Sequence, residues 1–103
     1  MTEGDIMRQI MVALSADGHF VARANVGLFF TAEGRPIKTG LPKGFSDLFG
    51  HRASDCQAFY LEVKTPKGRP SPEQLAFIAA MKNRGAIAAI VRSVEDARRA
   101  LSG

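Results

Sequence analysis

The stretch "FYLEVKTPKGRPSPEQ", residues 59–74, joins an apolar run that carries two charges to a basic turn and then to a helix start. Successive side chains of a strand point to opposite faces. One face of this run is therefore entirely apolar, with Phe59, Leu61 and Val63. Tyr60, Glu62 and Lys64 share the other face, where the two charged residues are about 7 Å apart at the backbone. The run predicts a strand at about 57–65 that holds a charged pair.

The end of the same stretch carries the signals of a helix N-terminus. Ser71 is a favourable N-cap, Pro72 fits the first helical position, and Gln74 completes a capping box three residues after the cap. Apolar residues recur after it at helical spacing, and Gly85 supplies the stop. The uninterrupted apolar run "AIAAIV", residues 86–91, then predicts a strand covered on both faces.

Two further helices are expected near the chain ends. Thr2 followed by Asp5 resembles a capping box, and apolar residues at helical spacing predict a helix over about 3–16 that Gly18 ends. Ser93 caps a last short helix that runs through about residue 101.

Two further strands complete the predicted sheet. The first is expected at 19–23 and the second at 45–49, and the turn at 50–55 joins the second to the strand at 57–65. The predicted order is α-β-β-β-α-β-α. This order is typical of an α/β fold in which helices flank a mixed β-sheet.

Residues 25–44 predict a long, basic loop that is rich in turns. Its turn-forming residues are Gly27, Gly34, Pro36, Gly40, Pro42 and Gly44. Loops of this length in a compact domain are usually functional or mobile. Leu28, Phe29 and Phe30 within it have three alternative roles: a protein interface, a wedge into DNA, or a part of the core.

The charged pair suggests a metal site if the strands at 45–49 and 57–65 pair, because Asp47 then lies beside Glu62. Two partly buried carboxylates side by side would not normally both stay ionised. A divalent cation removes that conflict, and Mg²⁺ accepts one or two carboxylates together with water and substrate phosphate. The Val63 carbonyl would add a further ligand, and Lys64 would activate a water or stabilise charge on a phosphate. Alternatively, Glu62 and Lys64 form an ordinary ion pair on a solvent-exposed face.

The composition indicates a single domain over residues 1–103 with a moderate positive charge. The net charge of +4 and the pI near 9.7 suit a polyanionic partner such as nucleic acid. The lone Cys56 excludes an internal disulfide, and with His19 and His51 it does not make a zinc site. The sequence has neither a leader pattern nor an apolar segment of membrane-spanning length. We therefore expect a soluble, cytoplasmic protein, from a phage or a bacterial host.

Four segments together resemble the PD-(D/E)XK nuclease superfamily, and more closely its VRR-NUC (virus-type replication-repair nuclease) branch. They are "EGDIMRQI" near the start, "GLPKGFSDLFG" from residue 40, "YLEVKTPKGRPSPEQ" from residue 60 and "GAIAAIVRS" from residue 85. The E-x-K tripeptide is common by itself, and the combination makes the resemblance specific. It implies a restriction-endonuclease-like fold over the whole chain.

The resemblance also implies roles for individual residues. Asp47 and Glu62 would be metal ligands, Lys64 the catalytic lysine, and Gln74 and Glu3 the remaining active-site residues. Each of the last two has a structural alternative, since Gln74 fits the capping box and Glu3 suits the first turn of a helix. Ser46 stands where the family usually has proline.

The activity implied is that of an endonuclease dependent on Mg²⁺ or Mn²⁺. It would cut branched DNA, such as four-way junctions or flaps, in replication, repair or recombination, and symmetric cutting of a junction would require a homodimer. Basic residues at the rim would contact phosphates or be ordinary surface charges: Arg35, Lys38, Lys43, Lys67 and Arg69. The alternatives are a non-catalytic DNA-binding module and a subunit recruited by a helicase or replication partner. RNA cleavage of the tRNA-splicing type is disfavoured, because no histidine lies near a tyrosine–lysine pair.

Overall fold

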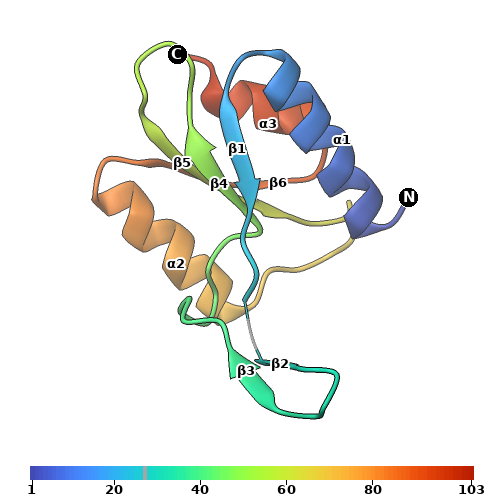
Figure 1. The fold of residues 1–103 in the computed structure, drawn as a ribbon. Coiled ribbons are helices and arrows are strands. Elements are labelled where there is room, and N and C mark those ends of the chain that lie inside the picture. The colour runs from blue at the N-terminus through green and yellow to red at the C-terminus, as the bar shows by residue number, and fades with distance from the viewer. Residues whose placement is uncertain (27) are drawn as a thin grey trace.

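The computed structural model describes residues 1–26 and 28–103, which form three helices and six strands in that part of the chain (Figure 1). The helices are α1 (Glu3–Ala16), α2 (Pro72–Asn83) and α3 (Val94–Leu101). The strands are β1 (Phe20–Arg23), β2 (Leu28–Phe30), β3 (Pro36–Lys38), β4 (Leu48–His51), β5 (Ala58–Val63) and β6 (Ile87–Val91). Within the described ranges no helix has the length and apolar character needed to cross a membrane.

Four strands form a mixed sheet in the order β1-β4-β5-β6, which confirms the predicted fold class. The pairs β1–β4 and β4–β5 are antiparallel, and β5–β6 is parallel. The parallel pair follows from the chain path, because α2 carries the chain from the end of β5 back to the start of β6. The predicted element order fits broadly, with two strands added in the segment that was expected to be a loop.

The sheet separates two layers of helix, and the alternation of side chains along β5 decides what each layer contacts (Figure 1). On one face, α1 and α3 pack over the main core. The core contains Ile6, Met7, Ile10, Leu14, Leu48, Phe59, Leu61, Val63, Val91, Ala97 and Leu101. On the other face α2 packs, with Tyr60 of β5 5.6 Å from Phe77 between ring centroids. Glu62 therefore lies on the same side of the sheet as α2.

The helix ends predicted from the sequence are present. Thr2 and Asp5 form a reciprocal capping box at α1, and Ser71 and Gln74 form one at α2. Each box satisfies backbone N–H groups that have no partner within the helix. Gly85 has a φ of +92°, as expected for the residue after a helix C-terminus.

The predicted boundaries of the strand at 45–49 are wrong. β4 begins at Leu48 and runs to His51, so Gly50 lies inside the strand and not in a turn. A Cβ atom on Gly50 would lie 1.9 Å from the Phe20 carbonyl oxygen of β1. Gly50 therefore has no side chain because β1 and β4 approach closely at this point. The two strands are far apart in the sequence, so local turn propensity cannot reveal this contact. The turn comes later, where the Arg52 N–H donates to the Gln57 carbonyl.

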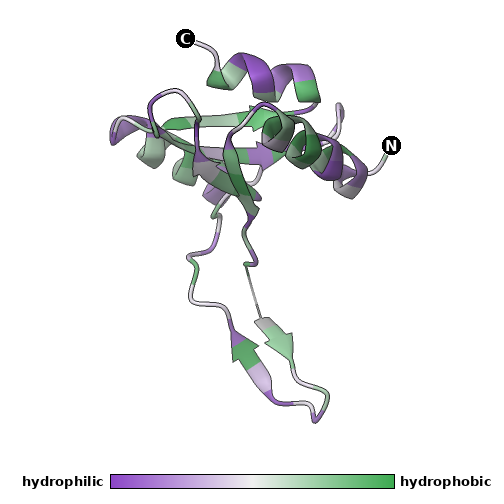
Figure 2. Cartoon of the chain, turned by 45° about the horizontal axis from the view of Figure 1, so that its top comes forward, coloured by the Kyte–Doolittle hydropathy of each residue, from purple (hydrophilic) through white to green (hydrophobic). Residues whose placement is uncertain are grey.

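The interpretation of residues 25–44 as a loop without regular structure is also wrong in part. β2 and β3 pair antiparallel and form a hairpin that projects from the body of the protein (Figure 2). Gly34 lies in the hairpin turn with a φ of +83°, the Thr31 N–H donates to the Arg35 carbonyl, and Pro36 begins β3. Each strand is only three residues long, which is too short for an alternation of apolar and polar residues to indicate a strand in the sequence. Gly27, which supported the loop interpretation, lies outside the described residues.

The exposure of the hairpin excludes a core role for two of its apolar residues. Phe29 is 49% exposed and Phe30 is 65% exposed, so neither belongs to the core. The side chain of Leu28 lies outside the described part of the structure. The other two alternatives, a protein interface and a contact with DNA, stay predictions for Phe29 and Phe30.

Candidate active site

Asp47 and Glu62 meet at one end of two adjacent strands. Leu48 pairs with Leu61 at the first position of β4, and continuing this register by one residue places Asp47 opposite Glu62. The Val63 N–H donates a hydrogen bond of 2.8 Å to Asp47 Oδ2 and so fixes the aspartate against β5. The predicted juxtaposition of the two carboxylates is therefore present in the structure.

Glu62 is a buried carboxylate that is only half satisfied. Its side chain is almost fully enclosed, with 1% of the residue exposed. Oε2 accepts a hydrogen bond of 3.1 Å from Gln74 Nε2 and lies 3.7 Å from Lys64 Nζ. While the carboxyl is ionised, Oε1 has no hydrogen-bond partner among the described residues, whereas the protonated Glu62 can donate to Asp47. Such an oxygen is costly unless it receives a proton or a cation.

The surroundings of Glu62 favour its neutral form. Burial comes first among the causes that raise the pKa of Glu62 to about 8, and Asp47 contributes to the same rise by accepting the proton and by its own charge. The charge of Lys64 acts in the opposite direction, and Glu3 adds a smaller contribution that raises the pKa. The alternative of a solvent-exposed Glu62–Lys64 pair is wrong, because Glu62 is buried.

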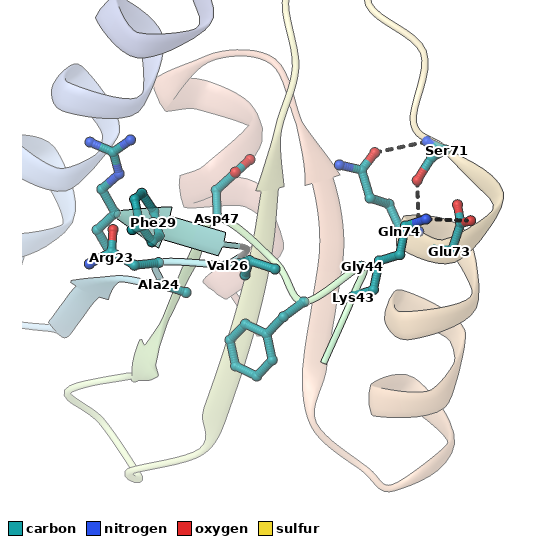
Figure 3. Close-up of a pocket in the computed structure, with 12 residues that line it drawn as sticks. Arg23, Ala24, Val26, Phe29, Lys43, Gly44, Asp47, Ser71, Glu73 and Gln74 are labelled. Atoms are coloured by element: carbon teal, nitrogen blue, oxygen red, sulfur yellow. Dashed lines mark hydrogen bonds and ion pairs between the residues drawn. The ribbon is translucent and has the colours of Figure 1, made fainter. Parts of the chain in front are cut away.

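Gln74 combines the two roles that its sequence position allowed. Its Oε1 accepts from the Ser71 N–H at 2.8 Å, as a capping box requires (Figure 3). Its Nε2 donates to Glu62 Oε2. The first turn of α2 is thereby joined to the end of β5. Glu3 is partly buried in the first turn of α1, and its effect on Glu62 is electrostatic.

A family model for the VRR-NUC domain matches residues 35–95, which is more than half of the chain. The chain belongs to the VRR-NUC domain family. Two solved structures share the fold, one described as a VRR-NUC domain and the other as a VRR-NUC domain protein. The first superposes with a TM-score of 0.67 at 23% identity and covers 96% of this chain and 94% of its own. The second has a TM-score of 0.57 at 16% identity, and the match covers 93% of this chain and 81% of the other. No curated protein matches the chain.

VRR-NUC domains are nuclease-type domains that process DNA, so family membership implies an endonuclease with DNA as its substrate. The site can be tested for a fit to a divalent metal by its own chemistry. No cluster of three or more His, Cys, Asp or Glu side chains that could hold a metal occurs within residues 1–26 and 28–103. Mg²⁺ does not need one, since it is usually held by one or two carboxylates with water and phosphate. The unpartnered Glu62 Oε1 beside Asp47 fits such a half-shell.

The predicted basic residues of this VRR-NUC domain fall into three places. Lys67 and Arg69 are exposed in the connection between β5 and α2, close in sequence to Lys64. Lys43 precedes β4, and its Nζ lies 3.6 Å from Glu73 Oε1. Arg35 and Lys38 belong to the β2–β3 hairpin, which projects from the body of the protein (Figure 2).

Two arginines that the sequence analysis did not single out also contribute to this region. Arg92 Nη1 donates to the Gly68 carbonyl at 2.7 Å and also to that of Thr65, so it holds the basic turn after β5. Arg23, the last residue of β1, lines a pocket together with Asp47 and Gln74. Both contacts join segments that are far apart in the chain, and therefore no local pattern could have predicted them.

Proposed function

We propose that this VRR-NUC domain is a divalent-metal-dependent, structure-specific endonuclease that hydrolyses phosphodiester bonds in branched DNA. The observation that carries the proposal is the buried, half-satisfied Glu62 beside Asp47 and Lys64. A purely structural carboxylate would be expected to have both oxygens paired. A carboxylate with one free oxygen and a raised pKa is instead typical of a functional site.

Asp47 and Glu62 would hold Mg²⁺ or Mn²⁺, and the Val63 carbonyl is the third proposed ligand. When bound, the metal would supply Lewis acidity to a phosphate oxygen and lower the pKa of the attacking water. Gln74 fixes Glu62 in one orientation through its amide N–H. Glu62 would have to release its proton to hold the metal, because only the carboxylate binds metal.

Lys64 is proposed to contact the reacting phosphate. Its ammonium group is held near Glu62 Oε2, at the edge of the two-carboxylate site. A cation at this place would stabilise the negative charge that develops on the phosphate oxygens during attack by water. Glu3 would complete the site by adding negative charge near the metal.

The branched substrate is proposed from the resemblance to the family, and the basic residues of the domain would provide the contacts to it. Lys67 and Arg69 would bind backbone phosphates near the site, and Arg35 and Lys38 would bind DNA farther away. Cutting both sides of a four-way junction requires two sites and therefore a homodimer, whereas one flap requires a single site. A helicase or replication protein would be the partner if the isolated chain binds branched DNA without cutting it.

The test is cleavage of end-labelled four-way junction, flap and linear duplex DNA in Mg²⁺, Mn²⁺ and EDTA. The native chain is compared with Glu62→Ala and with Glu62→Gln, which keeps the shape of the side chain. Cutting of branched DNA that requires metal and disappears in both variants supports the proposal. Survival of every substrate in every metal, with DNA binding retained, would instead identify a non-catalytic or partner-dependent module.

A further inference from the structure

A pocket lies at the base of the β2–β3 hairpin and shares residues with the proposed active site. Its volume is about 320 Å³. Three separate segments contribute to its walls: Arg23 at the end of β1, Phe29 of the hairpin, and Lys43 to Asp47 before β4. The start of α2 closes it with Ser71, Glu73 and Gln74 (Figure 3). Asp47 and Gln74 therefore belong both to the pocket and to the carboxylate site.

The size of this pocket limits what can occupy it. Pockets for small ligands range from about 300 to 1,000 Å³, so this one lies at the lower limit. A single nucleotide is of that class, whereas a base-paired duplex, whose major groove alone is about 12 Å wide, cannot enter. A base that enters it from DNA must therefore be unpaired.

The lining offers the two kinds of group that bind an unpaired nucleotide. Phe29 presents an aromatic ring that is half exposed, on which a base can stack. The Arg23 side chain is exposed and has no hydrogen-bond or ion-pair partner among the described residues, so its guanidinium is free for a phosphate. Lys43, the other cation of the lining, is already paired with Glu73.

The hairpin has two different faces, and only one belongs to the pocket. Phe29 pairs with Ile37 across the two strands, so these residues share one face of the hairpin, and Phe29 on that face lines the pocket. Phe30 pairs with Pro36, and alternation places both on the opposite face. Phe30 is therefore an internal control for Phe29: it is the same residue type, in the same strand and even more exposed.

We propose that this pocket binds one unpaired nucleotide of the DNA, with Phe29 stacking on the base and Arg23 contacting a phosphate. The inference deepens the proposed function and rests on it, because the pocket is useful for cleavage only if Asp47 and Glu62 form the active site. An unpaired nucleotide held beside Asp47 places the adjoining phosphodiester bond next to the carboxylates. The pocket then favours a flap over a fully paired nicked duplex.

The test measures binding, so it does not depend on cleavage. Fluorescence anisotropy of the full chain is recorded with a labelled flap and with a nicked duplex of the same sequence that lacks the flap, in EDTA and again in Ca²⁺. The native chain is expected to bind the flap about tenfold more tightly than the nicked duplex, which is the size of one base–aromatic stacking contact. Phe29→Leu should lose this difference, whereas Phe29→Tyr and Phe30→Leu should keep it.

A second variant tests the proposed contact between Arg23 and a phosphate. Arg23→Gln should weaken flap binding and reduce the slope of log affinity against log salt by about one, as expected for the loss of one phosphate contact. Light scattering of every variant checks the oligomeric state. If Phe29→Leu and Phe30→Leu lose flap binding equally, or if either loses a dimer present in the native chain, the hairpin is a protein interface and the proposal is wrong.

The failure of this inference can be distinguished from that of the proposed function. Equal binding of flap and nicked duplex by the native chain, with metal-dependent cleavage intact, overturns the nucleotide pocket alone. A flap preference that depends on Phe29, in a chain that cuts no substrate in any metal, supports the pocket as a binding site and overturns the catalytic assignment.

Discussion

Gln74 Nε2 donates a hydrogen bond of 3.1 Å to Glu62 Oε2, while Oε1 of the same amide accepts from the Ser71 N–H. One side chain therefore completes the cap of α2 and holds the buried carboxylate at the end of β5. A helix start specified by local sequence is in this way connected to the site formed by the sheet. The stability of α2 and the geometry of Glu62 should depend on each other.

The first prediction concerns this double role. Gln74→Ala should lower the free energy of unfolding by about 1 kcal/mol, because it removes the cap contact, and should reduce cleavage because Glu62 loses its orienting partner. Asp5→Ala is the matched control, since Asp5 holds the same position in the capping box of α1. It should destabilise the protein and leave cleavage largely intact. Equal losses of cleavage in the two folded variants would contradict the positioning role of Gln74.

The second prediction concerns the dependence of stability on pH without metal. The pKa of Glu62 is raised to about 8 in the folded protein, above its unfolded value, so the fold favours the neutral carboxyl. The stability that this provides is fully present below the unfolded pKa and is lost as the pH rises through 8. Glu62→Gln mimics the neutral form. In EDTA it should therefore be more stable than the native chain by a few kcal/mol above pH 8, and similar to it near pH 4.

Thermal melts of both proteins across this range measure the effect. Asp55→Asn is a control of opposite sign, because hydrogen bonding to Arg52 lowers the pKa of Asp55 to about 2. This variant should be less stable than the native chain at neutral pH, and the difference should disappear as the pH falls toward 2. A native chain whose stability rises between pH 5 and pH 9 relative to Glu62→Gln would contradict the raised pKa.

The third prediction concerns metal binding. A metal ion must displace the proton of Glu62, so apparent Mn²⁺ affinity should increase by up to about tenfold per pH unit below pH 8 and level off above it. Calorimetry in buffers of different ionisation enthalpy measures the proton release directly. Glu62→Gln should bind Mn²⁺ weakly at every pH and release no proton. Affinity independent of pH in the native chain would exclude Glu62 as the ligand.

The fourth prediction separates Lys64 from its basic neighbours. Lys64→Ala should lower kcat by about 10²-fold or more, as the loss of one stabilising cation does in other active sites. It should also move the onset of activity to higher pH, because the charge of Lys64 lowers the pKa of Glu62. Lys67→Ala, an exposed change three residues away, should leave kcat unchanged and weaken DNA binding slightly, more at low salt. Equal effects of the two variants on kcat would remove Lys64 from the catalytic step.

The fifth prediction concerns the approach of the segment before β4 to α2. Gly44 has a φ of +88°, and a Cβ atom there would lie 2.5 Å from the Glu73 carbonyl oxygen. Gly44→Ala should therefore push the start of α2 away from Asp47 and reduce both stability and cleavage. Gly40→Ala introduces a similar backbone strain at a φ of +80°, where a Cβ would meet no described atom within 4 Å. Gly40→Ala should lower the free energy of unfolding, measured in denaturant, by only about 1–2 kcal/mol and leave cleavage unchanged.

The sequence by itself determined the elements whose signals are local. The capping boxes of Thr2 and Ser71 placed the starts of α1 and α2, because a cap depends only on residues three or four positions apart. Strand alternation placed Glu62 of β5 and Lys64, which follows the strand, on one side. The pairing of Asp47 with Glu62 was expected only if the two strands paired, and its register, with Leu48 opposite Leu61, came from the structure because the predicted turn was misplaced.

Only the tertiary structure decided the environment of these residues. The burial of Glu62 and its raised pKa arise because α2 covers that face of the sheet and Gln74 reaches it from another element. Gly50 looked like a turn residue, and only its contact with Phe20 shows that it belongs inside β4. The hairpin and the pocket at its base depend on segments from Arg23 to Gln74 that meet in space. Burial, close backbone approach and pockets are properties of such long-range contacts, which no window of the sequence contains.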